Sequence, residues 1–183
     1  GVDNGERIKK LAKNPIVLIA IKKICEKYAK MELMSGVTTI RTVGGAKNYD
    51  TEIRNKINAG KMIGPRVLAS NYAISVPDGH MAGSLAYIAN SADEAVQYVR
   101  KIAEDHPDLI KLMITGGVLD AKAKGEPGEL KMPAEYVKAA CEEAHHLGLK
   151  VAAHVESPEG VRVALENGVD TIEHGAQPDE TIL

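Results

Sequence analysis

The sequence predicts an α/β fold in which parallel strands are covered by helices. From about residue 15 onward, short apolar or β-branched segments alternate with segments of helical periodicity. No linker or low-complexity tract interrupts this alternation. Strict alternation requires parallel strands joined by right-handed crossovers through helices. Two architectures satisfy it, an open doubly wound sheet and a (β/α)₈ barrel.

Each predicted helix is followed by a predicted strand. The helices span residues 15–36, 49–60, 91–103, 133–148 and 158–168. The strands span residues 37–41, 66–70, 109–115, 151–155 and 171–174. Pro15 and Gly36 delimit the first helix, and Ser91 with Glu94 forms a capping box at the third. Residues 73–90 are rich in turn-forming residues, so we predict a long irregular loop there.

The strand segments are short and consist mainly of apolar or β-branched residues. The first reads Val-Thr-Thr-Ile-Arg at 37–41, and the third reads Leu-Ile-Lys-Leu-Met-Ile-Thr at 109–115. Five strands complete a doubly wound sheet, whereas a complete barrel takes about 250 residues. With 183 residues in the chain, length alone favours the open sheet.

Composition excludes several classes of protein. The 23 basic and 25 acidic side chains give a net charge of −2, so we expect neither nucleic acid nor membrane as a partner. The two cysteines form no Cys-x-x-Cys pair, which favours a reducing cytoplasmic location. We expect a single domain over residues 1–183, and the ends at Gly1 and Leu183 suggest that both termini are truncated.

Chemistry is expected at the carboxyl ends of the strands, where parallel α/β folds place their sites. His154 and His174 close two successive strands, so their imidazoles should lie within reach of one metal ion. Lys111 sits in the middle of an apolar strand, where burial lowers an amine pKa. The alternative is that both histidines are structural and that Lys111 pairs with a carboxylate such as Glu173.

Several segments resemble the metal-dependent amidohydrolase superfamily, in particular its imidazolonepropionase-like branch, which includes Xaa-Pro dipeptidases. The resemblance lies in the segments Gly36–Arg41 with Gly44-Gly45, Gly64-Pro65-Arg66, Asp78-Gly79-His80, Ile110–Met113 with Gly116-Gly117-Val118, Ala152-Ala153-His154, and Gly168–Gly175. These motifs run in order across nearly the whole chain.

The resemblance implies part of a TIM-like (β/α)₈ barrel, strands two to six of eight, with the helices outside. It implies two divalent metal ions, usually zinc, bridged by carboxylated Lys111, with His154 and His174 as ligands of the second ion. His80 would lie near the substrate carbonyl as a catalytic residue. A metal-bridged hydroxide would then hydrolyse a C–N bond in a small amide, cyclic amide or dipeptide.

The chain also departs from the family pattern. Every histidine lies at position 80 or later, so the His-x-His of the first strand has no counterpart. The catalytic Asp after the eighth strand is also absent, and we expect little or no hydrolysis from these 183 residues alone. Glu156 stands where prolidase-like relatives often have a tyrosine-containing turn, and it would repel a substrate carboxylate.

Two interpretations without catalysis stay open. One is a doubly wound binding module without metal chemistry. The other is an assembly domain that pairs through exposed strand edges, an arrangement compatible with a homo-oligomer. Replacing Lys111 distinguishes them from the enzyme, because metal binding falls only if this lysine is a ligand.

Overall fold

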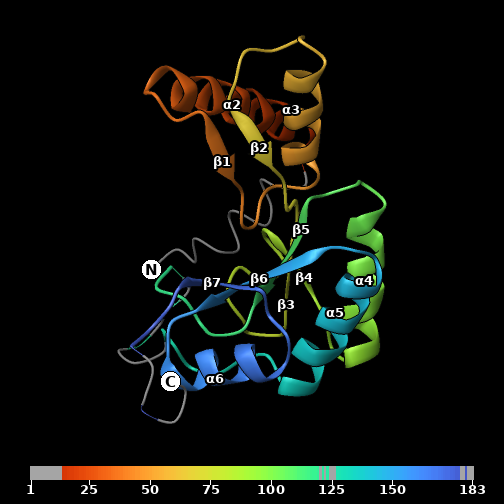
Figure 1. Ribbon diagram of the computed structural model, residues 1–183, viewed down its shortest axis with the longest axis vertical. Coiled ribbons are helices and arrows are strands. Elements are labelled where there is room, and N and C mark those ends of the chain that lie inside the picture. Colours follow the sequence, from red (N-terminus) through yellow and green to blue (C-terminus); the bar gives the residue numbers. More distant parts are fainter. Residues whose placement is uncertain (1–13, 120, 122, 124–126, 178–179, 181–183) are drawn as a thin grey trace.

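The strands form two sheets, each built of parallel strands, and the helices pack outside them (Figure 1). The computed structural model describes residues 14–119, 121, 123, 127–177 and 180. The helices are α2 (Pro15–Met34), α3 (Tyr49–Asn58), α4 (Ala92–Ala103), α5 (Ala134–His146) and α6 (Pro158–Glu166). The strands are β1 (Thr39–Arg41), β2 (Arg66–Leu68), β3 (Ala73–Ser75), β4 (Ala86–Ile88), β5 (Leu109–Met113), β6 (Lys150–Val155) and β7 (Thr171–His174).

Local sequence signals place the helices as predicted. The side chain of Asn14 accepts the backbone N–H of Ile16 at the start of α2, next to Pro15. Ser91 accepts the N–H of Glu94 at 3.1 Å, so the predicted cap of α4 is confirmed. The Glu94 carboxylate binds the backbone N–H of Asn90, one residue before the cap. Capping groups of this kind satisfy the unpaired N–H groups of the first helical turn.

The prediction of a long loop over residues 73–90 is wrong. Strands β3 and β4 lie within it, and they pair in parallel with each other. Each strand has only three residues, and the turn-forming residues between them dominate the composition of the segment. β3 is buried in all three positions, so packing in the sheet rather than local propensity makes it a strand.

The larger sheet has the strand order β4-β3-β5-β6-β7, and its two faces differ. Alternate residues of β5 and β6, such as Leu112 and Ala153, pack with α4, α5 and α6 in the main apolar core. The residues between them, Lys111 and His154 among them, therefore face away from these helices. The side chains singled out from the sequence thus share the face that the helices leave open.

The smaller sheet pairs β1 with β2 and connects to the larger one through residues 69–72. The end of β1 contacts β7. The Arg41 guanidinium lies 2.8 Å from the Glu173 carboxylate and donates a hydrogen bond to the Thr171 hydroxyl at 2.9 Å. The strands therefore form an arc with all pairs parallel and with helices outside. This arrangement confirms the α/β class and is consistent with a partial barrel.

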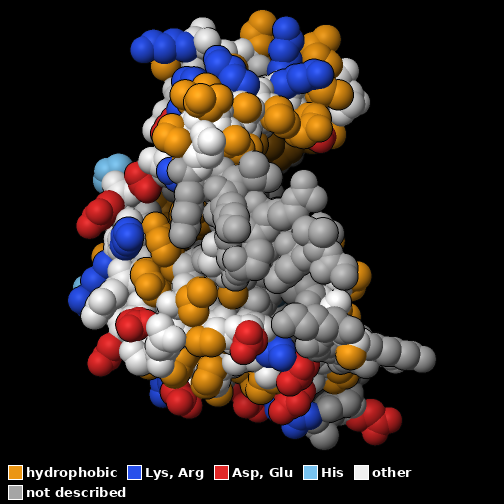
Figure 2. All heavy atoms as spheres, turned by 180° about the vertical axis from the view of Figure 1, so that it is seen from behind, with side chains coloured by type: hydrophobic (Ala, Val, Ile, Leu, Met, Phe, Trp, Pro, Cys, Tyr) orange, Lys and Arg blue, Asp and Glu red, His pale blue; other side chains and the backbone are white. Residues whose placement is uncertain are grey.

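Helix α2 contributes little to the core, since Ala29 is the only buried residue of this helix. Its exposed apolar side chains are Ile16, Ile19, Ile24, Tyr28, Met31 and Met34. Figure 2 shows hydrophobic and basic side chains gathered on this upper part of the molecule. Within the described residues, no helix combines the length and the apolar character that crossing a membrane requires.

We expect Asp170→Asn to destabilise the fold near neutral pH. Its carboxylate accepts hydrogen bonds from Lys150 at 2.6 Å and from the Val151 N–H at 2.8 Å, and it lies 2.8 Å from His145 Nε2. Burial alone would raise the pKa of Asp170, but these partners lower it to about 2. A lowered pKa means that the stabilisation is present above about pH 4 and is lost as the pH falls toward 2.

The free energy of unfolding at pH 7 should therefore fall by about 1 to 2 kcal/mol in the Asn variant. Urea unfolding measured from pH 7 down to pH 3 tests this, and the difference from the wild type should shrink below pH 4. Glu142→Gln is the matched control, because Glu142 is exposed and only 4.0 Å from Lys138 in a surface pair. A loss that does not change with pH would contradict the assignment.

Candidate metal centre

Lys111 lies in β5, the central strand of the larger sheet, and its side chain is only 1% exposed. Its Nζ has no hydrogen-bond partner among the residues that the structure describes. Burial lowers the pKa of Lys111 to about 7; the charge of Glu173 opposes this shift and that of Arg41 adds to it. A large fraction of this amine is therefore neutral at physiological pH, which is the nucleophilic form.

Glu173 does not pair with Lys111. Its carboxylate binds Arg41 at 2.8 Å and accepts the Thr171 hydroxyl at 3.1 Å. The alternative in which Glu173 neutralises the lysine is therefore not observed. The ion pair between Arg41 and Glu173 leaves the Lys111 amine free to react or to bind.

His154 lies on β6, the strand next to Lys111, and pairs in register with Met113. Its ring is 3% exposed, and its Nε2 is 3.2 Å from the carbonyl oxygen of Gly116. A donated N–H at this position leaves Nδ1 with its lone pair for another partner. Burial, followed by the charge of His80, lowers the pKa of His154 to about 4. The imidazole is thus neutral at physiological pH, which is the form that binds metal ions.

His80 and His174 lie on either side of His154. The centroids of the His80 and His154 rings are 4.2 Å apart in a stacked arrangement, and those of His154 and His174 are 4.9 Å apart. The three side chains come from the segment between β3 and β4 and from the ends of β6 and β7. Gly117 supports this cluster, since a Cβ at that position would overlap the His80 ring.

Glu156 is a possible ligand that the sequence analysis did not identify. His154, Glu156 and His174 each offer one ligand atom, and these three atoms lie within 4.8 Å of one another. Its spacing of two from His154 is a partial signal, since residues two apart on an extended strand share a face. The strand ends at Val155, however, so the orientation of Glu156 depends on the turn that follows. The sequence indicates for Glu156 only the repulsion of a substrate carboxylate.

The residues present fit a divalent metal ion. They combine two imidazoles and a carboxylate within a small volume. The sheet face of His154 also carries the Lys111 amine, which has no hydrogen-bond partner in the described part of the chain. Imidazole and carboxylate are common zinc ligands, and a carboxylated lysine would add a second anionic oxygen donor. The structure brings His80, His154 and His174 together and places Lys111 on the same face of the sheet. Their assigned roles stay predictions.

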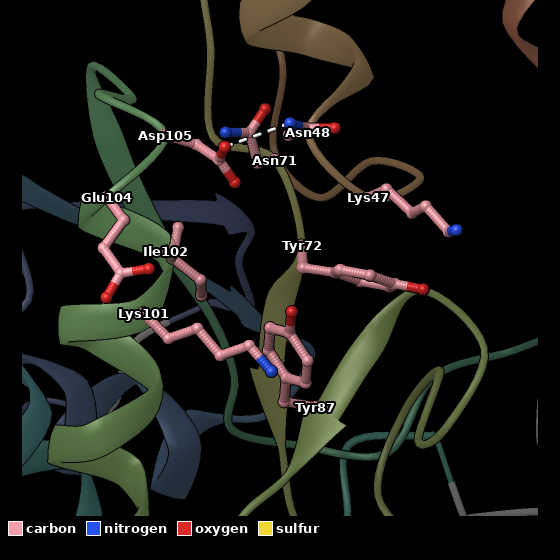
Figure 3. A pocket seen from close by; sticks show the side chains of 9 residues that line it. All are labelled: Lys47, Asn48, Asn71, Tyr72, Tyr87, Lys101, Ile102, Glu104 and Asp105. Atoms are coloured by element: carbon pink, nitrogen blue, oxygen red, sulfur yellow. Dashed lines mark hydrogen bonds between the residues drawn. The ribbon is translucent and has the colours of Figure 1, made fainter.

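A separate cavity of about 280 Å³ lies away from the histidines (Figure 3). Tyr72 and Tyr87 meet in it with ring centroids 4.8 Å apart, and the Lys101 ammonium lies 4.7 Å from the Tyr87 ring. The Asn48 amide donates to Asp105 across its rim at 3.0 Å. Its lining residues among the described part of the chain include no histidine, so this cavity is separate from the histidine cluster.

The sequence model of the amidohydrolase family matches residues 11–181 of the chain. The chain belongs to this family. The resemblance inferred from the sequence motifs is thereby confirmed, including its prolidase-like branch. Membership also establishes that the protein is related to amidohydrolase enzymes.

Individual amidohydrolases show the same relationship. A crystal structure of a Xaa-Pro dipeptidase with bound methionine is 32% identical, with a TM-score of 0.79 over 88% of this chain and 42% of that one. A proposed prolidase from Bifidobacterium longum is 42% identical, with a TM-score of 0.73 over 84% of this chain and 36% of that one. Ochratoxinase from Aspergillus niger is 28% identical over 174 residues, covering 82% of this chain and 35% of the relative. This amidohydrolase chain thus spans less than half the length of these relatives.

Proposed function

We propose that the protein contributes the second metal-binding half of an amidohydrolase site that hydrolyses C–N bonds in small amides or dipeptides. One observation carries the proposal. Among the described residues, the buried Lys111 amine has no hydrogen-bond partner, and it lies on the sheet face that also carries His154. The His154 ring contacts the rings of His80 and His174. A lysine in that setting costs stability unless its amine is neutral or paired, which favours a functional role for it.

In this proposal Lys111, carboxylated by carbon dioxide, holds divalent metal together with His154 and His174. The complete enzyme would contain two ions, which we propose to be zinc. A bound metal would supply Lewis acidity and lower the pKa of a water molecule, which is the chemistry of a metal-bridged hydroxide.

The side chains of this chain have separate tasks. His154 offers a neutral imidazole that Gly116 orients through its carbonyl oxygen. Arg41 keeps the Glu173 carboxylate away from the Lys111 amine, so that the amine can react with carbon dioxide. His80, whose ring stacks on that of His154, would donate a ring N–H to the substrate carbonyl.

The substrate class follows from the relatives, whose names include a Xaa-Pro dipeptidase and an ochratoxinase. We propose a small amide or dipeptide, without nucleic acid or membrane partners, and a cytoplasmic location. The single domain over 1–183, the homo-oligomer and the low activity of this chain by itself also stay predictions.

Binding of a transition-state analogue tests the function without requiring turnover. We expect a phosphonate analogue of an Xaa-Pro dipeptide to bind the zinc-loaded protein and not the protein treated with a chelator, as measured by calorimetry. His106→Asn is the control variant. Because His106 is exposed, its replacement should leave the zinc-dependent binding unchanged. Equal binding with and without zinc would contradict a metal-dependent site.

A further inference from the structure

Glu156 directly follows β6 and lies two residues after His154, so its side chain can reach the same site as the histidines. Its backbone N–H donates to the Thr115 hydroxyl at 3.1 Å, which fixes the turn at the end of the strand. Close packing of Gly128 against the Glu156 carbonyl holds the other side of this turn. The backbone is therefore well anchored, while the carboxylate is half-buried and able to rotate.

The carboxylate of Glu156 has no other evident task. Among the residues that the structure describes, none is hydrogen-bonded to or ion-paired with it. Other carboxylates near strand ends are occupied, as Glu173 is by Arg41 and Asp170 by Lys150. A partly buried carboxylate beside two imidazoles is stabilised most effectively by a cation.

The distances suit a metal ion after a small adjustment. Ligand atoms around tetrahedral zinc stand roughly 3.3 Å apart, as bond lengths of about 2.0 to 2.1 Å require. The three candidate atoms here lie within 4.8 Å of one another. The three atoms therefore need to approach one another only slightly to surround one ion. Two histidines and one glutamate form a recurrent protein zinc site that leaves a position open.

We propose that Glu156 is a protein ligand of the metal ion held by His154 and His174. This inference rests on the proposed function, because it concerns the same ion, and it adds a ligand that does not depend on carbon dioxide. Lys111 becomes an anionic ligand only after carboxylation, whereas Glu156 is already a carboxylate. The protein should therefore hold one metal ion even when Lys111 carries no carboxyl group.

The test is a titration with Co²⁺, whose visible absorption reports its coordination. It is carried out in buffer depleted of carbon dioxide and again with added bicarbonate. Glu156→Gln keeps the size of the side chain and removes the charge. Glu159→Gln is the matched control, because Glu159 is an exposed acid in the first turn of α6. Far-ultraviolet circular dichroism verifies that each variant is folded.

We expect Glu156→Gln to weaken Co²⁺ binding by at least about tenfold without carbon dioxide and to change the absorption spectrum. Glu159→Gln should bind as the wild type does. Added bicarbonate should restore part of the affinity of Glu156→Gln, through Lys111. Wild-type affinity and an unchanged spectrum in Glu156→Gln would overturn the inference.

The proposed function fails in a different way. Suppose that Lys111→Met and His154→Asn both bind Co²⁺ as the wild type does and that bicarbonate has no effect. The metal site proposed on Lys111, His154 and His174 is then wrong, even if Glu156 binds an ion. If the wild-type protein binds no Co²⁺ in either buffer, both proposals are overturned.

Discussion

Lys111→Met should make the protein more stable at pH 7 while weakening its binding of zinc. The substitution replaces a buried amine, which has no hydrogen-bond partner among the residues described, with an apolar side chain of similar length. Replacing buried charged groups with apolar ones of similar volume often stabilises a fold by about 1 to 4 kcal/mol. Opposite changes in stability and in zinc affinity are expected of a functional residue and not of a structural one.

The pH dependence of this gain follows from the pKa. Burial lowers the pKa of Lys111 to about 7 in the folded protein, whereas a free lysine titrates near 10.4. Because the pKa is lower in the folded state, burial of this amine reduces the free energy of unfolding. The full reduction applies below pH 7, and it disappears as the pH rises toward 10.4. The advantage of the Met variant should therefore shrink above pH 7 by roughly 1.4 kcal/mol per pH unit.

Urea unfolding between pH 6 and pH 9 measures the stability, and calorimetry with zinc measures the binding. Lys138→Met is the control, because the Lys138 side chain is 64% exposed on α5 and its substitution should change neither property. A Met variant that keeps both the wild-type stability and the wild-type zinc affinity would show that Lys111 is neither strained nor a ligand.

His154→Asn should produce the largest loss of metal binding among single histidine replacements. His154 is the central ring of the cluster, stacked on His80 and edge-on to His174. It also lies on the strand paired with that of Lys111, two residues beyond the Lys111 partner Ala152. Its removal takes away a neutral nitrogen ligand that no other described side chain is placed to replace.

Removing a residue that only orients a metal ligand typically lowers metal affinity by about 10- to 100-fold. Loss of the ligand itself should lower zinc affinity by at least as much. Isothermal titration with zinc measures it, and His106→Asn is the control because His106 is exposed and lies outside the cluster. Asn keeps a polar group that can still bond to the Gly116 carbonyl, so the fold should be retained. Equal losses in both variants would indicate a general effect on folding.

The sequence predicted most of the fold because its strands and helix ends carry strong local signals. The strand at Leu109–Met113 is apolar except for Lys111, and Ser91 acts as the helix cap that its sequence position indicates. β3 and β4 were missed because each has three residues and is stabilised by its neighbours in the sheet rather than by its own composition. Pairing between segments distant in the chain has no local signature.

The candidate site was predicted in part. The positions of His154 and His174 at successive strand ends predicted their proximity, and the apolar surroundings of Lys111 predicted its burial. The pairing of Glu173 with Arg41 could not be predicted, because 132 positions separate these residues in the chain and only the curvature of the sheet brings them together. The orientation of Glu156 toward the histidines likewise depends on how the chain turns after β6.

A native mass spectrum of the protein after incubation with zinc and bicarbonate tests the central claim most directly, because it reports bound metal and lysine carboxylation together. We predict a species that carries zinc together with the added mass of one carbon dioxide. Lys111→Met should lose the carbon dioxide and retain less zinc than the wild type. A wild-type spectrum that shows the bare chain mass of 19.6 kDa under these conditions would contradict the account.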